Sequence, residues 1–142
     1  VDASLGADFL ASVENLPFGV GEFDLVCAFE VLEHLPFDKF GLALREMHRV
    51  TKKYAIISLP HWGRHFSFMM RLPFFKKIKW QKKFSFFPPE HIFNGQHFWE
   101  IGKRRYNLKK IKKIIVSSGF VLLKDYIIFD SPYHRIFILR KK

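Results

Sequence analysis

The sequence predicts an α/β protein built on a parallel sheet, and three neighbouring segments predict it. Residues 23–29 (FDLVCAF) form a short, evenly apolar run, which is typical of a strand buried on both faces. Residues 39–50 repeat apolar side chains at helical spacing behind Asp38, which can cap a helix. Residues 54–59 are β-branched and apolar and end at Pro60, so they predict the next buried strand. A strand, a helix and a strand in this order form a right-handed crossover.

The helix of residues 39–50 has one apolar face and one polar face. Its apolar side chains can pack on the sheet, and they are Phe40, Ala43, Leu44, Met47 and Val50. We expect its polar side chains to lie mostly toward solvent, and they are Arg45, Glu46, His48 and Arg49. His48 is therefore expected to be a surface histidine rather than a ligand.

The segment before the first strand is expected to contain one short strand and a loop. Residues 9–13 predict the strand and residues 14–18 the loop that leaves it, because Pro17 ends any regular element. Gly19 and Gly21 then supply a turn.

The carboxyl-terminal part predicts a helix followed by two strands. Residues 108–115 repeat Leu and Ile at helical spacing, and residues 117–119 (SSG) end this helix. Residues 120–129 and 133–139 predict two strands joined through residues 130–132. We expect these strands to form an antiparallel hairpin at the edge of the sheet.

Composition indicates one globular domain over residues 1–142. The 49% of hydrophobic residues excludes a disordered chain, and no apolar stretch reaches the roughly 18 residues that a membrane span needs. The single cysteine, Cys27, excludes an internal disulfide and indicates a reducing, cytoplasmic compartment. Because Cys27 lies within a predicted strand, we expect a buried, inert thiol.

Positive charge is concentrated in the second part of the chain. Residues 1–50 carry a net charge of −6, whereas residues 51–142 carry +17. Between Trp62 and Pro89 there is no acid, and basic residues alternate with aromatic ones. This pattern suits RNA, a phosphorylated substrate or an anionic membrane surface, and it suits equally a lid with a solvated face. We expect residues 61–106 to form an insert or lid.

Polar residues gather where the first predicted strand ends. Glu30, Glu33 and His34 follow it directly, and His61 follows the second strand. Open α/β sheets bind ligands beyond the carboxyl ends of their strands. This rim is therefore the predicted site. The segment of residues 90–106, with a turn at Asn94-Gly95, either closes over a substrate or forms a packed turn.

The order of five short motifs resembles the second half of class I S-adenosylmethionine-dependent methyltransferases. The motifs are LPF at residues 16–18, FDLV at 23–26, EVLEHL at 30–35, LREMHRV at 44–50 and ISLP at 57–60. The resemblance implies an incomplete Rossmann-like methyltransferase sheet, because the glycine-rich GxGxG loop with its strand and helix does not occur in the sequence. We therefore expect a fragment of such an enzyme, inactive alone, with a poorly anchored amino-terminal segment.

The resemblance also implies which residues hold the cofactor, S-adenosyl-L-methionine. Asp2 stands where the family places the acid that accepts hydrogen bonds from the ribose hydroxyls. The adenine is expected against Ser12, Val13 and Glu14, although the family commonly has an acid near Ser12. Phe29 and Glu30 are expected to line the site from the end of the central strand. The methyl acceptor stays unidentified.

His34 is the first candidate for a catalytic base, because imidazole titrates near neutral pH. A backbone hydrogen bond that holds the loop is its alternative role. If the segment after the strand is helical, Glu30, Glu33 and His34 share a face, and with His61 they could bind a divalent cation. This ExxEH pattern resembles metal-dependent small-RNA and ubiquinone-biosynthesis methyltransferases, but EVLEHL also occurs in relatives that need no metal, so no metal is favoured.

The alternative to an enzyme is a non-catalytic module. In that case residues 62–89 would dock on nucleic acid or on an anionic membrane surface, which would make the protein peripheral to a membrane.

Overall fold

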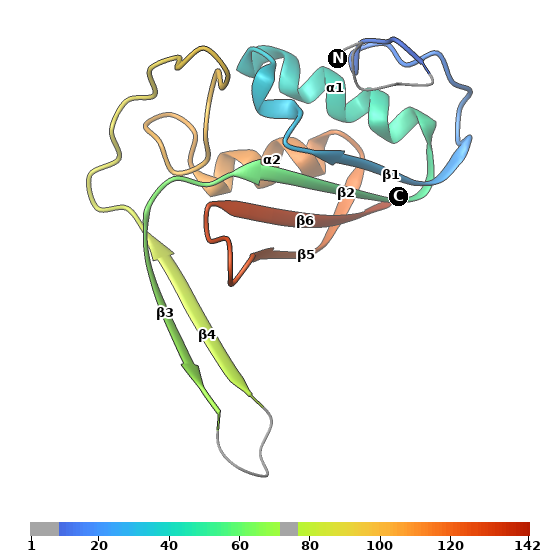
Figure 1. The fold of residues 1–142 in the computed structure, drawn as a ribbon. Coiled ribbons are helices and arrows are strands. Elements are labelled where there is room, and N and C mark those ends of the chain that lie inside the picture. Colours follow the sequence, from blue (N-terminus) through green and yellow to red (C-terminus); the bar gives the residue numbers. More distant parts are fainter. Residues whose placement is uncertain (1–8, 72–76) are drawn as a thin grey trace.

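The computed structural model describes residues 9–71 and 77–142 of the chain, and its body is a four-stranded sheet in the order β1-β2-β6-β5 (Figure 1). The strands are β1 (Phe23–Phe29), β2 (Thr51–Pro60), β5 (Phe120–Ile127) and β6 (His134–Lys141). β1 and β2 are parallel, whereas β6 runs antiparallel to both β2 and β5. The predicted parallel pair and terminal antiparallel hairpin are confirmed.

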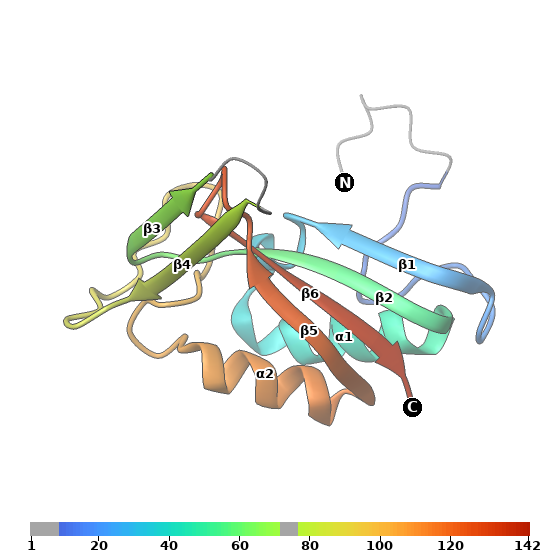
Figure 2. The ribbon, with the colours of Figure 1, turned by 90° about the horizontal axis from the view of Figure 1, so that it is seen from below.

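Two helices cover one face of this sheet (Figure 2). They are α1 (Phe37–Val50) and α2 (Leu108–Ser117), and a short 3-10 turn, η2 (Leu32–His34), precedes α1. α1 begins after Pro36, so Asp38 lies in its first turn and does not cap it. The fixed φ of proline explains this start. The Asn107 side chain caps α2 by accepting a hydrogen bond from the N–H of Lys110.

The core lies between the two helices and the sheet. The predicted apolar face of α1 is buried there in full. It meets apolar side chains of every strand of the main sheet and of α2, which include Ala28, Ala55, Ile57, Ile111, Ile115, Phe120 and Phe137. Trp99, from the loop before α2, completes the core with no exposed surface.

β1 is the edge strand of the described sheet, which corrects the expectation of a strand buried on both faces. Val26 and Ala28 face α1 and the core. Leu25 and Phe29, on the opposite face, are 48% and 55% exposed. Cys27 shares that face and is also exposed, so the expectation of a buried thiol was wrong. The apolar run reflects strand propensity, and burial depends on what pairs and packs with the strand.

The segment before β1 contains no strand over residues 9–13. Ser12 instead forms an isolated bridge with Asn15, which closes a tight turn. The Phe9 ring contacts the Phe18 ring edge-on, with 5.2 Å between ring centroids. Asp2, the expected ribose ligand, lies outside the described residues.

His48 is half-buried against Phe120, so it is not the fully exposed surface histidine that the sequence predicts. Its ring contacts Phe120 edge-on, and a Cβ on Gly119 would lie 2.8 Å from its Nε2 atom. Gly119 also has φ of +101°, so glycine is required there for two reasons. Desolvation lowers the pKa of His48 below its usual value.

The basic aromatic segment contains a second sheet of two antiparallel strands. They are β3 (Arg64–Met70) and β4 (Ile78–Phe84), and they reach away from the main sheet (Figure 1). The loop from residue 85 to 107 then returns to α2. No helix in the described part of the chain is long and apolar enough to span a membrane.

Candidate functional site

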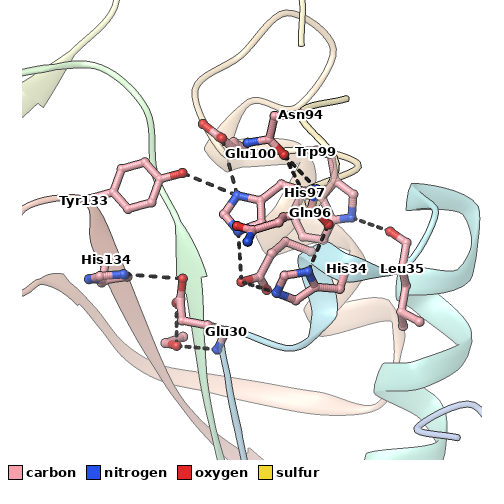
Figure 3. A network of polar contacts seen from close by, with 12 residues as sticks. Glu30, His34, Leu35, Asn94, Gln96, His97, Trp99, Glu100, Tyr133 and His134 are labelled. Carbon is pink, nitrogen blue, oxygen red and sulfur yellow. Dashed lines mark hydrogen bonds and ion pairs between the residues drawn. The ribbon is translucent and has the colours of Figure 1, made fainter. Parts of the chain in front are cut away.

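Glu30 lies where β1 ends, and two other strands hold its carboxylate. The Ser58 hydroxyl of β2 donates to Glu30 Oε1 at 2.6 Å and accepts from the N–H of Glu30 at 2.9 Å. His134 of β6 places Nε2 at 3.4 Å from Glu30 Oε2 (Figure 3). Because these contacts fix both oxygens, the carboxylate is preorganised at the rim.

The backbone of Glu30 is strained, with φ of +51°. Such a conformation is uncommon for a residue with a side chain and is retained where the surroundings enforce it. In this conformation the N–H of Glu30 donates to the Ser58 hydroxyl, and the Glu30 carboxylate accepts from the same hydroxyl. The chain turns sharply after β1, and this turn aims the following residues across the rim.

The predicted adenine-binding turn is anchored to α1. Ser12 Oγ accepts from the N–H of Glu14 at 3.2 Å, and Glu14 pairs with Lys39 of α1 at 3.6 Å. Glu46 Oε1 accepts from the N–H of Leu16, and this carboxylate also binds Arg49.

Arg49 completes the anchor by donating to the backbone carbonyl oxygens of Leu16 and Phe18. Glu46 and Arg49 were expected to face solvent and are instead the residues that fix this loop. Residues three positions apart on a helix can form an ion pair, so the spacing of Glu46 and Arg49 was the sequence signal for their pairing.

An apolar cavity of about 250 Å³ lies between this loop, α1 and β1. Its lining comprises Val13, Leu16, Phe18, Phe23, Val26, Cys27, Ala28, Val31, Met47 and Val50. The cavity thus connects the turn at Val13 with Val31, which follows Glu30 at the rim.

Glu33 is fully buried beside the rim, and neither oxygen of its carboxylate has a hydrogen-bond partner. Desolvation raises its pKa to about 8, against a usual value of 4.5. An unpaired buried carboxylate is costly, so this position requires a proton or a cation.

Two histidines aim their Nε2 atoms at this carboxylate. His34 Nε2 and His97 Nε2 each lie 4.0 Å from Glu33 Oε1. His34 Nδ1 donates to the carbonyl oxygen of Gln96 at 2.9 Å, which leaves Nε2 as the basic atom of the neutral ring. Figure 3 shows the two rings side by side. The backbone role expected as an alternative for His34 is therefore present.

The loop of residues 94–100 presents His97 to this group. Asn94 Oδ1 accepts from the N–H groups of Gln96 and His97, which confirms the predicted turn. Trp99 Nε1 donates to the carbonyl oxygen of Leu35 at 3.1 Å and so ties the loop to the segment after η2 (Figure 3). Glu100 Oε1 lies 3.4 Å from His97 Nδ1. Desolvation, together with Glu100, raises the pKa of the nearby Tyr133 phenol above its usual value.

Among the residues that the structure describes, one set of possible metal ligands has its ligand atoms within 4.8 Å of one another. It comprises Glu33, His34 and His97. Glu30 and His61, the other members of the set predicted from the sequence, are not in this group. His61 is 8% exposed, and its Nδ1 accepts a hydrogen bond from Arg135 at 3.0 Å. Burial, together with Arg135, lowers the pKa of His61 to about 3, so it stays neutral. Sequence spacing gave no signal for His97.

The first part of the chain matches a known family of sequences. The model of the methyltransferase domain family matches residues 3–59. A search of curated protein sequences found no significant match.

Solved methyltransferase structures share the fold. 1,6-Didemethyltoxoflavin-N1-methyltransferase of Burkholderia thailandensis, solved with 1,6-didemethyltoxoflavin and S-adenosylhomocysteine, matches with a TM-score of 0.58 at 14% identity, over 93% of this chain and 49% of that chain. Magnesium protoporphyrin IX methyltransferase of Synechocystis PCC 6803, solved with S-adenosylhomocysteine, matches with a TM-score of 0.52 at 14% identity. The match covers 93% of this chain and 49% of that chain. An S-adenosylmethionine-dependent methyltransferase of Mesorhizobium loti matches with a TM-score of 0.54 at 13% identity, over 92% and 68%.

These matches confirm the predicted fold class. At such identities they show a common Rossmann-like arrangement and leave the acceptor open. This chain spans about half the length of the first two structures.

Proposed function

We propose that this chain, whose residues 3–59 match the model of the methyltransferase domain family, takes part in methyl transfer from S-adenosylmethionine to an acceptor at the rim of its sheet. The observation that carries the proposal is the Glu30 carboxylate, which Ser58 and His134 fix at the carboxyl end of β1 beside an apolar cavity. Ligands of open α/β sheets bind at this end of the strands.

The residues present fit the nucleoside part of the cofactor. The anchored turn at Ser12, Val13 and Glu14 and the adjoining cavity offer an apolar surface for a purine, with polar groups at its edge. Glu30 would bound the site at the end of β1, whereas Phe29 lies on the opposite face of this strand from the cavity. S-adenosylmethionine supplies an activated methyl group, so the chain must mainly bind and align the two reactants, which can contribute roughly 7 to 11 kcal/mol.

We assign the role of general base to His34. Its Nδ1 atom is engaged by the carbonyl oxygen of Gln96, so Nε2 carries the free electron pair. The side chain is 45% exposed, which leaves it accessible to an acceptor. An acceptor hydroxyl or amine within hydrogen-bond reach of Nε2 would lose its proton there, and such catalysis contributes about 10²- to 10⁴-fold.

Calorimetric titration of the full-length protein that contains these residues with S-adenosylhomocysteine tests the proposal. We expect 1:1 binding, and we expect Glu30→Ala to weaken it by about tenfold because a fixed polar partner is lost. Glu90→Ala is the matched control, since that side chain is 59% exposed and lies outside the site. A titration without heat, together with no binding in equilibrium dialysis, would contradict the proposal.

A divalent cation at Glu33, His34 and His97 is the alternative to the base role of His34, because the same Nε2 atom would bind the cation. It is supported by a buried carboxylate without hydrogen-bond partners and two imidazoles whose Nδ1 atoms are oriented by oxygens. A histidine that binds a metal through one ring nitrogen typically donates the N–H of its other ring nitrogen to an oxygen atom. The donor set of two imidazoles and one carboxylate suits zinc or manganese.

Thermal unfolding of the full-length protein with and without Zn²⁺ or Mn²⁺ tests this site without any assay of activity. We expect the cation to raise the melting temperature of the wild-type protein and to leave Glu33→Gln unchanged, because the variant lacks the anionic ligand. The control His65→Gln changes an exposed histidine of β3 and leaves the ligand group intact. If the cation stabilises all three proteins equally, or none, the site does not exist.

A further inference from the structure

The β3-β4 hairpin has one face on which six of the eight paired side chains are apolar. Side chains alternate between the faces of a strand, and directly paired residues share a face. The pairs Phe68 with Trp80 and Met70 with Ile78 therefore lie on the same face as Phe66 and Phe84. We call this the apolar hairpin face, and it comprises Phe66, Phe68, Met70, Ile78, Trp80 and Phe84.

The opposite face of β4 packs against the main domain. Gln81 donates to the carbonyl oxygen of Ile127, and Lys83 donates to those of His61 and Pro132. Lys79 lies 4.6 Å from the centre of the Phe129 ring. These contacts fix the hairpin so that its apolar face points away from the domain.

The apolar hairpin face is open to solvent in the described part of the chain. Phe66, Ile78 and Trp80 are 51–56% exposed, which is unusual for three large apolar side chains on one small sheet. The Phe66 and Trp80 rings contact each other edge-on, with 5.9 Å between ring centroids, so these two side chains pack together on the face. Beyond β4, Phe86 is 78% exposed and its ring centroid lies 5.4 Å from that of Phe84, so it extends this face.

All charge on this face is positive. Lys82 pairs with Phe66 and Arg64 pairs with Phe84, so both cations lie on the apolar hairpin face, and both are exposed. No acid occurs between residues 62 and 89. An apolar surface with aromatic and basic residues and without acids is complementary to the headgroup region of an anionic bilayer.

We propose that the apolar hairpin face docks the protein on a lipid bilayer that carries anionic headgroups. Trp80 and the phenylalanines enter the boundary between headgroups and acyl chains, while Arg64 and Lys82 contact lipid phosphates. Lys83 links the hairpin to the backbone of His61, so docking holds the rim of the main sheet close to the membrane.

The composition of the face favours lipid over nucleic acid. Met70 and Ile78 offer no ring for a base to stack on, and they lie among the aromatic side chains. Among the paired residues of β3 and β4, two cations share the face, which is few for a path that follows a phosphate backbone. The positive charge also opposes pairing with a second copy of the same face.

Co-sedimentation of the full-length protein with vesicles tests the proposal, and it needs neither cofactor nor acceptor. We expect binding to phosphatidylcholine vesicles that contain phosphatidylglycerol, with at least tenfold less protein bound to phosphatidylcholine alone. Trp80→Ser and Lys82→Glu should each reduce binding at least tenfold. The matched controls are Ser67→Ala on the opposite face and Lys109→Glu on α2, and both should bind as the wild type does.

Three results would overturn the proposal. The first is absence of binding to anionic vesicles by a protein that circular dichroism shows to be folded. The second is binding to a single-stranded oligonucleotide, without vesicle binding, that Trp80→Ser abolishes. The third is a concentration-dependent dimer, again without vesicle binding, that Trp80→Ser dissociates.

Discussion

Replacing Trp99 by alanine is expected to destabilise the protein by about 3 to 5 kcal/mol. Trp99 has no exposed surface, and its ring contacts Phe37 and Phe40 of α1 at centroid distances of 5.1 and 4.8 Å. Its removal leaves a large cavity and also removes the hydrogen bond to the carbonyl oxygen of Leu35. The free energy of unfolding in urea, followed by far-ultraviolet circular dichroism, measures the loss.

Trp80→Ala is the matched control, because it removes the same side chain from a position that is 51% exposed. We expect it to change the free energy of unfolding by less than about 1 kcal/mol. If Trp99→Ala lowers the free energy of unfolding by no more than this control does, the loop that carries His97 is not packed as described.

Replacing Asp125 by alanine is also expected to lower the free energy of unfolding by about 3 to 5 kcal/mol. Asp125 accepts from Arg135 of β6 and pairs with Lys112 of α2 at 2.5 Å. The Arg135 side chain is only 12% exposed, and burial lowers its pKa, an effect that Asp125 opposes. Without Asp125 a buried cation stays unpaired beside His61. Urea unfolding at pH 7 measures the cost.

A second substitution separates loss of the charge partner from loss of packing. Adding Arg135→Met to Asp125→Ala removes the unpaired cation, so we expect most of the lost stability to return. Asp24→Ala is the control, since the Asp24 and Lys53 side chains are 66% and 61% exposed and such pairs contribute little. A double variant as unstable as Asp125→Ala would show that the buried cation is not the cause.

The parts of the fold that depend on local pattern could be predicted from the sequence. The heptad-like spacing of α1, the β-branched run of β2 and the Gly119 stop after α2 each correspond to one observed element. The hairpin of β3 and β4 was not predicted, because its apolar residues are exposed and its pattern reflects no core. Burial of β1 was mispredicted because it depends on contacts distant in sequence.

The site was predictable only where its residues follow a strand end. Glu30, Glu33 and His34 lie at the rim because β1 ends there. His97, which is 63 residues after His34 in the sequence, joins Glu33 and His34 through a loop that the Asn94 turn and the buried Trp99 hold in place. Long-range packing of this kind leaves no periodic signal. For the same reason the sequence does not show that Glu46 and Arg49 anchor a loop instead of facing solvent, because their partners lie in the irregular segment before β1.

A structure of the full-length protein with S-adenosylhomocysteine bound tests the central claim most directly. We predict that the adenosine lies at the carboxyl end of β1, between the turn at Ser12 to Glu14 and the carboxylate of Glu30, with His34 facing the acceptor side. A ligand bound away from this rim, with Glu30 still held by Ser58 and His134, would contradict the account.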